Sequence, residues 1–299
     1  MSRKEHLLGF ILLILLGLTW GSSYILIKKG LIAFSPLQVA MLRFGLSGLA
    51  FAPLAFRYIF KLSAREMWML VFVGLLGSAL PAILFAFAQT RISSSMAGIL
   101  SSFTPLATYL FGLLFFGLIF FHRKLIGVLI GLSGALLMIW MSSNADASGD
   151  FWFGGLVLLA TICYALNGNL IKFYFQNHSP FLIATVSFSL TGLPVFGLLF
   201  VTDFTEIMTT HPHGWQSLGY ISILAVLGTV AASVVFFKLV QITDALFASS
   251  VSYLVPLFAV FWGLLDGESI HWYHFLGMVL ILAGIYYSRN TKIPGPPVT

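Results

Sequence analysis

Charged residues are scarce in this sequence of 299 residues. Only 8% of the residues are Asp, Glu, Lys or Arg, whereas 59% are hydrophobic. A soluble globular domain carries roughly a quarter of charged residues, and the mean hydropathy of this chain is +1.01. The composition therefore excludes a soluble globular protein and predicts a membrane protein.

Cysteine is scarcer still, because the only one, Cys163, lies inside an apolar stretch. A single cysteine excludes a disulfide framework within the chain. The sequence also lacks a glycine-rich phosphate loop, a nucleophile elbow and a zinc-protease pattern, which argues against direct use of ATP and against an enzyme. We expect no cofactor and no metal site.

What the chain does have is a series of apolar runs long enough to cross a hydrocarbon core of about 30 Å as helices. We predict ten spans separated by short polar joints. They cover residues 7–27, 35–56, 66–88, 94–120, 125–140, 152–175, 180–201, 218–239, 245–265 and 273–288. The first apolar run is of spanning length and no small-residue cleavage site follows it, so we interpret it as an uncleaved first helix. The tail, residues 291–299, has the proline and glycine content of a disordered segment.

The second half of the chain repeats the first. Residues 20–28, W-G-S-S-Y-I-L-I-K, align with residues 164–172, Y-A-L-N-G-N-L-I-K, and the same register continues without a gap from 35–49 into 179–193. Matches that stay in register across two helices indicate a duplicated unit. We assign residues 1–145 to the first five-helix repeat and residues 150–290 to the second.

An odd number of spans in each repeat makes the second copy start on the opposite side of the membrane. The predicted fold is therefore an all-α polytopic membrane protein with ten transmembrane helices in two inverted five-helix repeats. Inverted repeats suit alternating access, in which two half-structures rock around a site near the middle of the bilayer. This architecture favours a transporter over a membrane enzyme or a structural protein.

Basic residues indicate the orientation of the chain. With the amino terminus inside, most lysines and arginines fall in cytoplasmic joints and only three fall outside, namely Lys28, Lys29 and Arg91. This bias follows the positive-inside rule and predicts that both termini are cytoplasmic. Because the basic residues lie at helix ends rather than in one patch, we expect no nucleic-acid partner.

Several motifs resemble the EamA-type branch of the drug/metabolite transporter superfamily over nearly the whole chain. They are the W-G-S-S-Y opening with Lys28, the Arg43 of the second span, the proline-centred segments 101–106 and 252–257, and the closing G-E-S-I at Gly267 and Glu268. The first repeat departs from this pattern, because residues 115–118 are F-F-G-L and carry no glutamate. The resemblance implies an inner-membrane carrier of small organic metabolites, commonly amino acids and usually for export, but no particular substrate.

Arg43 is the main ionisable residue within a predicted span. A buried arginine is costly in hydrocarbon and usually faces a cavity or a partner. It can bind a substrate carboxylate or form a gate, contact a helix end, or extend along its own stem to the interface. The equivalent residue of the second repeat is Ser187, so any substrate contact of Arg43 is asymmetric.

Neutral polar and aromatic residues supply the other candidates for a central substrate site. Trp20, Ser23 and Tyr24 share one helix face by their spacing, and Tyr164 and Asn167 are their counterparts. The alternative for each serine is an ordinary helix-packing role. The predicted cavity residues are Trp20, Ser23, Tyr24, Arg43, Gln89, Ser101, Ser102, Tyr164, Asn167, Ser249 and Tyr253.

Three prolines and two lysines are candidates for moving parts. Pro81, Pro105 and Pro256 each remove a helix hydrogen bond and free a carbonyl four residues back, which makes each a hinge or a ligand for an ammonium group. Lys28 and Lys172 end equivalent spans on opposite faces, either as gates or as interfacial anchors.

Glu268 precedes the last span, where the helix dipole would stabilise its carboxylate; capping of that helix is the main hypothesis and proton coupling the alternative.

Taken together, the sequence predicts a secondary transporter that moves a small metabolite, with amino acids as the leading substrate class, across the inner membrane. A carrier of anionic or nucleotide-sugar-type metabolites, a membrane-embedded enzyme and a passive channel are the alternatives. The expected partners are a small-molecule substrate and the lipid bilayer. The oligomeric state stays open, with a monomer as one option.

Overall fold

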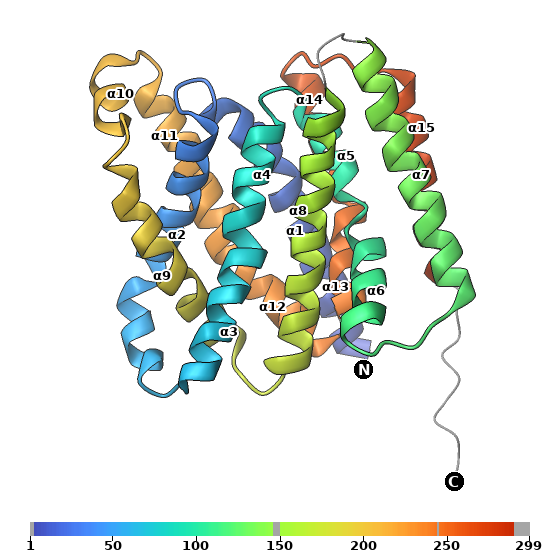
Figure 1. Cartoon of the computed structure of the whole chain (residues 1–299), viewed down its shortest axis with the longest axis horizontal. Helices are drawn as coiled ribbons and strands as arrows, with labels where there is room; N and C mark the ends of the chain where they lie inside the picture. Colours follow the sequence, from blue (N-terminus) through green and yellow to red (C-terminus); the bar gives the residue numbers. More distant parts are fainter. Residues whose placement is uncertain (1–2, 146–149, 244, 290–299) are drawn as a thin grey trace.

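The computed structural model describes residues 3–145, 150–243 and 245–289, and the predicted disordered tail lies outside these ranges. Every regular element within them is helical (Figure 1). The first half comprises α1 Arg3–Gly30, α2 Pro36–Ile59, α3 Ala64–Gly74, α4 Leu80–Ala88, α5 Ser94–Ser101, α6 Thr104–Phe115 and α7 His122–Ala145. The second comprises α8 Asp150–Tyr174, α9 Pro180–Leu199, α10 Phe204–Thr210, α11 Gly214–Ile223, α12 Ala232–Ile242, α13 Ala245–Ser249, α14 Val255–Leu265 and α15 Trp272–Arg289. The sequence interpretation did not include the short helix α10.

Serine residues begin several of these helices. The Ser35 hydroxyl accepts a hydrogen bond from the Gln38 amide, and the Gln38 side chain accepts one from the Ser35 amide. This reciprocal capping box satisfies two backbone donors that have no partner within the helix. Ser63, Ser93 and Ser179 cap α3, α5 and α9 in the same position. The polar joints seen in the sequence therefore fix where the helices start.

Eight segments of the described chain are long and apolar enough to cross a membrane. They are Ile11–Gly30, Pro36–Ile59, Ala64–Ala88, Ser94–Phe115, Trp152–Tyr174, Pro180–Leu199, Gly214–Ile242 and Phe247–Leu265. The two other predicted spans, 125–140 and 273–288, lie in α7 and α15, which are helical but are not among these eight. In α15 the apolar stretch is the shorter segment Trp272–Gly284.

Four of the eight segments are interrupted along their length. A π-helical turn, η1 (Leu75–Ala79), joins α3 to α4, and a longer one, η2 (Leu224–Ala231), joins α11 to α12. A turn at residues 102–103 separates α5 from α6, and a 3-10 turn, η3 (Ser250–Tyr253), separates α13 from α14. π-Helical turns are rare and occur frequently at functional sites.

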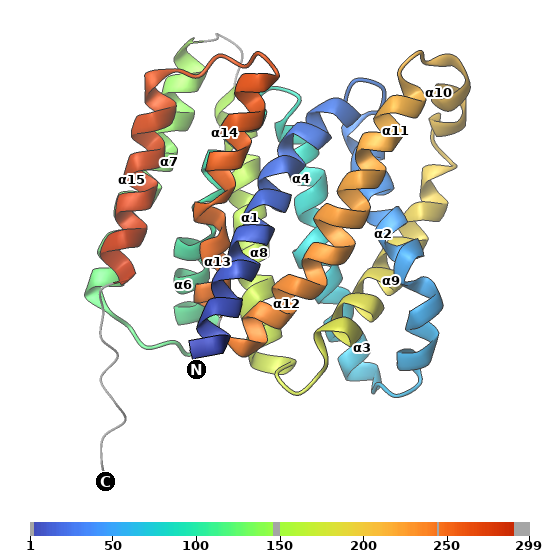
Figure 2. The same ribbon diagram turned by 180° about the vertical axis from the view of Figure 1, so that it is seen from behind.

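The helices form a bundle with two lateral pairs. Helix α2 packs against α9 on one side, and α7 packs against α15 on the other, with the interrupted helices, α1 and α8 between them (Figures 1 and 2). The start of α1 and the end of α15 lie at the same end of the bundle. We call this the Lys172 end; the opposite end, with the α4–α5 and α14–α15 joints, is the Lys28 end.

The crossing of α2 and α9 depends on two glycines. A Cβ added at Gly48 would lie 2.8 Å from both the Gly192 Cα and the Phe188 carbonyl oxygen. Small residues of this kind let two helix backbones approach closely, which is the usual way that helices associate in membranes. Because the obstacles at Gly48 are backbone atoms, no side-chain rotation can relieve the overlap.

We expect Gly48→Ala to destabilise the protein by about 1–3 kcal/mol, the usual cost of inserting a methyl group into a packed interface. Thermal unfolding of the purified protein in detergent would measure this as a lower midpoint. Gly197→Ala in α9 is the matched control, because nothing lies within 4 Å of its added Cβ. Equal midpoints for the two variants would contradict the close crossing.

Candidate functional site

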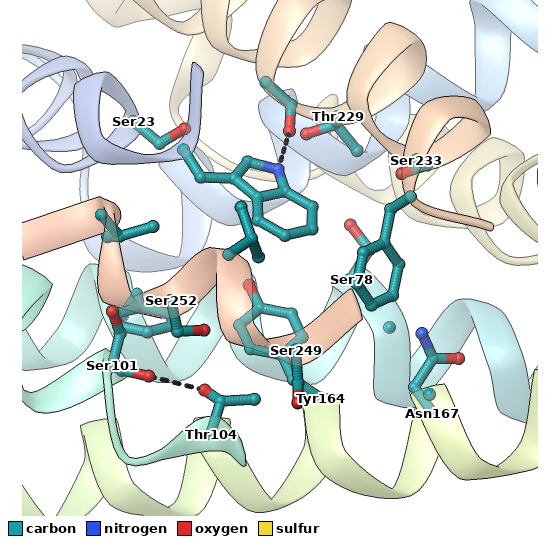
Figure 3. A pocket seen from close by; sticks show the side chains of 18 of the residues that line it. Ser23, Ser78, Ser101, Thr104, Tyr164, Asn167, Thr229, Ser233, Ser249 and Ser252 are labelled. Carbon is teal, nitrogen blue, oxygen red and sulfur yellow. Dashed lines mark hydrogen bonds between the residues drawn. The ribbon is translucent and has the colours of Figure 1, made fainter. Parts of the chain in front are cut away.

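The four interrupted segments face one another around a buried cavity of about 70 Å³. Figure 3 shows polar side chains from both halves of the chain converging on it. Its polar lining residues are Trp20, Ser23, Tyr24, Arg43, Ser78, Ser101, Thr104, Thr108, Tyr164, Asn167, Thr229, Ser233, Ser249 and Ser252. Since a water molecule needs roughly 10–15 Å³ of such volume, the cavity holds roughly five waters or a solute of similar size.

The two π-helical turns supply part of this lining. Gly77 and Ser78 come from η1, and Gly228 and Thr229 come from η2. A glycine next to a hydroxyl residue is thus presented to the cavity at each turn. The sequence interpretation did not single out Ser78, Thr104 or Thr108. The sequence signal that could have indicated these turns is a glycine followed by a hydroxyl residue within an otherwise apolar run.

The three predicted hinge prolines each follow an interruption. Pro81, Pro105 and Pro256 lie in the first turn of α4, α6 and α14, and none of them lines the cavity. Two of the carbonyls that they free already have donors. The Thr104 hydroxyl donates to the Ser101 carbonyl at 2.6 Å, and the Ser102 hydroxyl donates to the Ser252 carbonyl at 2.9 Å. These two carbonyls are therefore engaged within the protein.

Arg43 reaches the cavity from α2 and is only 7% exposed. Its Nε donates to the Thr229 hydroxyl at 2.9 Å, and its guanidinium interacts with the Tyr164 hydroxyl. It does not extend to the interface along its stem, so that alternative is wrong. Among the described residues, no carboxylate lies within ion-pairing distance of Arg43. The cavity therefore has a cationic group with no anionic partner.

Two acceptors that line the same cavity also lack partners. The Ser78 hydroxyl and the Asn167 carbonyl oxygen are buried and make no hydrogen bond within the described chain. Asn167 lies against Gly77, where an added Cβ would be 2.6 Å from its Nδ2. A buried polar group without a hydrogen bond costs about 1–3 kcal/mol, so a bound polar molecule would relieve that cost.

Aromatic rings form the apolar part of the wall. The Trp20 indole nitrogen donates to the Gly228 carbonyl at 3.0 Å, which fixes the ring against η2. Phe85 lies between two tyrosines, with ring centroids 5.3 Å from Tyr24 and 6.1 Å from Tyr164. Aromatic faces beside a single cation provide a surface for a small organic solute.

Most of the predicted cavity residues line this site. Trp20, Ser23, Tyr24, Arg43, Ser101, Tyr164, Asn167 and Ser249 do so, whereas Gln89, Ser102 and Tyr253 do not. Gln89 lies past the end of α4, and Ser102 turns toward the Ser252 carbonyl. Tyr253 belongs to η3 but does not face the cavity. Helix-face arguments failed here because each of these residues lies at an interruption or a helix end.

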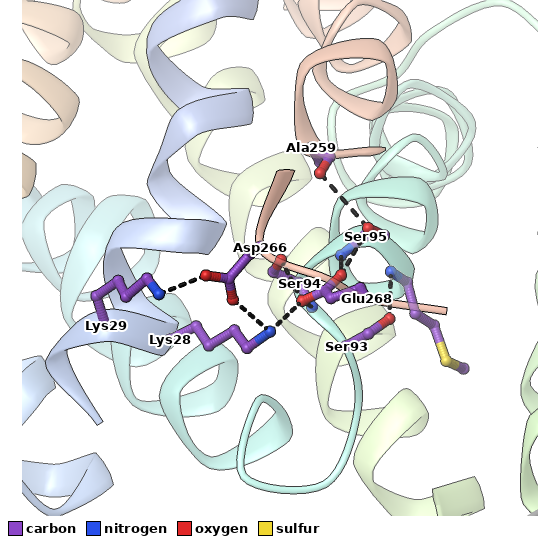
Figure 4. Close-up of polar contacts among 9 residues, drawn as sticks. Lys28, Lys29, Ser93, Ser94, Ser95, Ala259, Asp266 and Glu268 are labelled. Carbon is purple, nitrogen blue, oxygen red and sulfur yellow. Dashed lines mark hydrogen bonds and ion pairs between the residues drawn. The ribbon is translucent and has the colours of Figure 1, made fainter. Parts of the chain in front are cut away.

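At the Lys28 end, acidic and basic residues form a separate network (Figure 4). Lys28 pairs with Asp266 at 2.7 Å and with Glu268 at 2.9 Å, and Lys29 pairs with Asp266. The sequence interpretation expected Glu268 to cap α15, the helix that follows it. That expectation is wrong, because the Glu268 carboxylate accepts hydrogen bonds from the Ser94 and Ser95 amides at the start of α5.

The equivalent lysine at the other end has a different partner. Lys172 donates to the Thr243 carbonyl, which follows the last turn of α12, at 2.7 Å. Neither lysine lines the cavity. The two lysines therefore bind different acceptors: Lys28 binds two charged carboxylates, and Lys172 binds a neutral backbone carbonyl.

A bundle of membrane-length apolar helices around a buried polar cavity is the architecture of a polytopic membrane transporter. The family model of the EamA-like transporter family matches residues 7–140 and 151–289. The chain belongs to this family, and it is a multi-pass membrane transporter of the drug/metabolite type.

Named relatives resemble the chain at low identity over nearly its full length. The inner membrane transporter YedA of Escherichia coli is 25% identical over 100% of this chain and 96% of its own. A "probable amino-acid metabolite efflux pump" of Escherichia coli is 26% identical over 96% and 95%, and an S-adenosylmethionine/S-adenosylhomocysteine transporter of Chlamydia muridarum is 26% identical over 88% and 85%. A solved crystal structure aligns with a TM-score of 0.62 over 96% of this chain and 97% of its own at 16% identity, which shows the fold alone.

The charge of Glu268 gives a test of proton coupling. Burial opposes ionisation, but hydrogen bonds from Ser95, Ser94 and Lys28 outweigh it and lower the pKa of Glu268 to about 2. A depressed pKa means that the stabilisation is present above the ordinary carboxyl pKa and is lost only as pH falls through about 2. We expect Glu268→Gln to leave the shape of the transport pH profile unchanged between about pH 5 and 8, measured as flux in proteoliposomes. Loss of a pH step in this range would contradict the assignment.

Proposed function

We propose that this protein is a secondary transporter that moves small amino acids or close amino-acid metabolites by alternating access, in the direction of export. The observation that carries the proposal is the cavity itself, where the Arg43 guanidinium has no carboxylate partner and two buried acceptors have no donor. A zwitterion supplies both missing partners. Its carboxylate matches the guanidinium, and its ammonium matches the oxygens of Ser78 and Asn167.

The named relatives support this substrate class. One is named an amino-acid metabolite efflux pump, and another a transporter of S-adenosylmethionine and S-adenosylhomocysteine, both of which contain an α-amino-acid group. The volume of about 70 Å³ favours a small solute in this conformation. A nucleotide sugar is much larger and carries at least two phosphate charges, for which one arginine is a poor match.

Ten transmembrane helices in two inverted repeats form the proposed architecture. The two segments matched by the family model, 7–140 and 151–289, support a duplication. The interruptions support it further, because η1 and η2 occupy corresponding positions in the two halves, as do the turn at 102–103 and η3. The lateral pairs α2–α9 and α7–α15 bring corresponding helices together, as a twofold relation requires.

In this proposal the four interrupted helices move and the lateral pairs stay packed. Pro81, Pro105 and Pro256 are hinges, because each begins a new helical segment directly after an interruption. Lys28 and Lys172 are gate residues at the two ends. The Lys172 end is cytoplasmic by the distribution of basic residues, which puts both termini on that side of the inner membrane.

An enzyme is the alternative from another class. It would need a cluster of chemically active side chains near one interface. Within the described residues, no group of three or more His, Cys, Asp or Glu side chains could hold a metal ion. The family match and the names of the relatives instead favour a transporter.

Ligand screening followed by flux measurement tests the proposal. The purified protein would be screened against amino acids and other metabolites by thermal shift, and hits would be tested for counterflow in proteoliposomes. Counterflow of an amino acid would support a carrier, whereas leakage without counterflow would indicate a channel. Stabilisation by sugar nucleotides alone would instead favour the anionic-substrate alternative.

We expect Arg43→Gln to lower flux of the amino acid identified in this way by at least about ten-fold. The reason is that hydrogen bonds to charged groups contribute about 1.5–3 kcal/mol. Flux of the corresponding amino-acid amide, which lacks the carboxylate, should fall much less in the same variant. Arg57→Gln is the control, because Arg57 is exposed in the last turn of α2. An equal loss for acid and amide would show that Arg43 does not bind the carboxylate.

A further inference from the structure

The Glu268 carboxylate has five hydrogen-bond donors around its two oxygens. Oε1 accepts from the Ser94 amide at 3.0 Å, the Ser94 hydroxyl at 2.7 Å and the Lys28 ammonium at 2.9 Å. Oε2 accepts from the Ser95 amide at 3.0 Å and the Ser95 hydroxyl at 2.7 Å. Its side chain is only 5% exposed. One carboxylate therefore accepts hydrogen bonds from the first two amides of α5 and from Lys28 at the end of α1.

This carboxylate joins helices that are distant in sequence. Lys28 ends α1, Ser94 and Ser95 begin α5, and Glu268 lies in the joint after α14 (Figure 4). The same three helices pack closely below the network. An added Cβ would collide with Phe258 at Gly21, with Ala259 at Gly98, and with Ser95 and Glu268 at Gly263. The Trp262 indole also donates to the Ser22 hydroxyl at 2.8 Å. At the Lys28 end, α1, α5 and α14 are therefore in direct contact with one another.

A second pocket gives solvent access to the outer side of this network. It is lined by Lys28, Arg91, Ser93, Glu268 and His271, among other residues. The Lys28 side chain is 37% exposed, whereas that of Asp266 is 15% exposed. The ion pairs therefore lie between an outer pocket open to water and the buried central cavity, with Ile27 and Met96 in the adjacent helix turns.

The corresponding joint of the first half has no carboxylate. Helices α6 and α14 are each followed by a glycine with positive φ, Gly117 at 66° and Gly267 at 80°. The next residue is Leu118 in one case and Glu268 in the other, and each side chain folds back over a glycine of its own helix, Gly112 or Gly263. Leucine cannot cap a helix or pair with a lysine. Lys172 accordingly has the Thr243 carbonyl as its partner.

We propose that Glu268, Lys28 and Asp266 form an ionic latch that holds the Lys28 end closed and that has no counterpart at the Lys172 end. The latch rests on the proposed alternating-access function. It adds that one of the two closed conformations is more stable than the other. Closure at the Lys28 end is stabilised by charge and helix capping, while closure at the Lys172 end is not. The resting transporter therefore favours the conformation closed at the Lys28 end, and opening there requires the ion pairs to separate.

Cysteine accessibility tests the latch directly. In a Cys163→Ala background, Ser233→Cys places one thiol in the central cavity. A membrane-impermeant maleimide would be applied to right-side-out and inside-out vesicles, and the rate of labelling measured from each side. We expect Glu268→Gln to raise labelling from the Lys28 end about three- to ten-fold, because a net loss equal to about one ordinary hydrogen bond shifts a two-state equilibrium by about this factor. Labelling from the Lys172 end should fall.

The matched control is Glu206→Gln, an acid-to-amide change on α10 that lies outside the network. An equal rise in this control, or unchanged labelling in folded Glu268→Gln, would overturn the latch. If Glu268→Gln does not fold, Lys28→Gln gives the same test, since it removes the two ion pairs of Lys28 but leaves the capping of α5 in place. Unchanged labelling in Lys28→Gln would then reject the proposal.

Failure of the latch and failure of the transport function have different signatures. Labelling reports closure without any substrate, so unchanged labelling together with retained amino-acid counterflow would reject the latch alone. Shifted labelling with no flux of any tested metabolite would instead support the latch and reject the proposed substrate class.

Discussion

A backbone amide or carbonyl inside hydrocarbon must find its partner within the protein, because the lipid offers none. This constraint explains where the cavity lies. Four membrane-length segments of this transporter lose their regular α-helical hydrogen bonding along their length, and side chains of other residues replace several of the missing partners. Trp20 donates to Gly228 of the interrupted segment η2, and Ser102 donates to Ser252 of η3. The interruptions are stable only because they face one another and the polar side chains between them.

The same constraint separates structural polar groups from groups left for a ligand. Thr104 and Ser102 are engaged with carbonyls freed by prolines, so their hydroxyls stabilise the interruptions. The Ser78 hydroxyl and the Asn167 carbonyl oxygen have no such partner, and Arg43 has a threonine where a buried cation usually has a carboxylate. These unmet groups lie in one cavity. They are the basis of the proposed zwitterionic substrate, which has one negative and one positive group.

Sequence reasoning predicted the positions of the long helices and most of the cavity residues, because both follow from local signals. Apolar run length, serine caps and the repeated motif locate the spans, and pseudosymmetry singled out Trp20 and Tyr164. It failed where geometry depends on a distant contact. The π-helical turn that presents Ser78 to the cavity has no local signature beyond a pair of small residues. Gln89 does not line the cavity, because it lies past the end of its helix. Glu268 caps α5 rather than α15. A carboxylate in a joint can cap any helix whose start lies close to it in the folded protein, and the sequence alone does not show which start that is.

The two halves differ in sequence at the places where charge is located. Arg43 aligns with Ser187, and Glu268 aligns with Leu118, so neither of these two charged residues has a charged counterpart in the other half. In both cases the charged side chain binds across the duplication: Arg43 contacts Thr229 of the second half, and Glu268 binds α5 and Lys28 of the first. A contact within one half would move with that half and would be the same in both conformations. In the proposed alternating access, charges that join the halves would change partners as the halves move, and because neither charge has a charged counterpart, the two directions of that movement would differ in free energy.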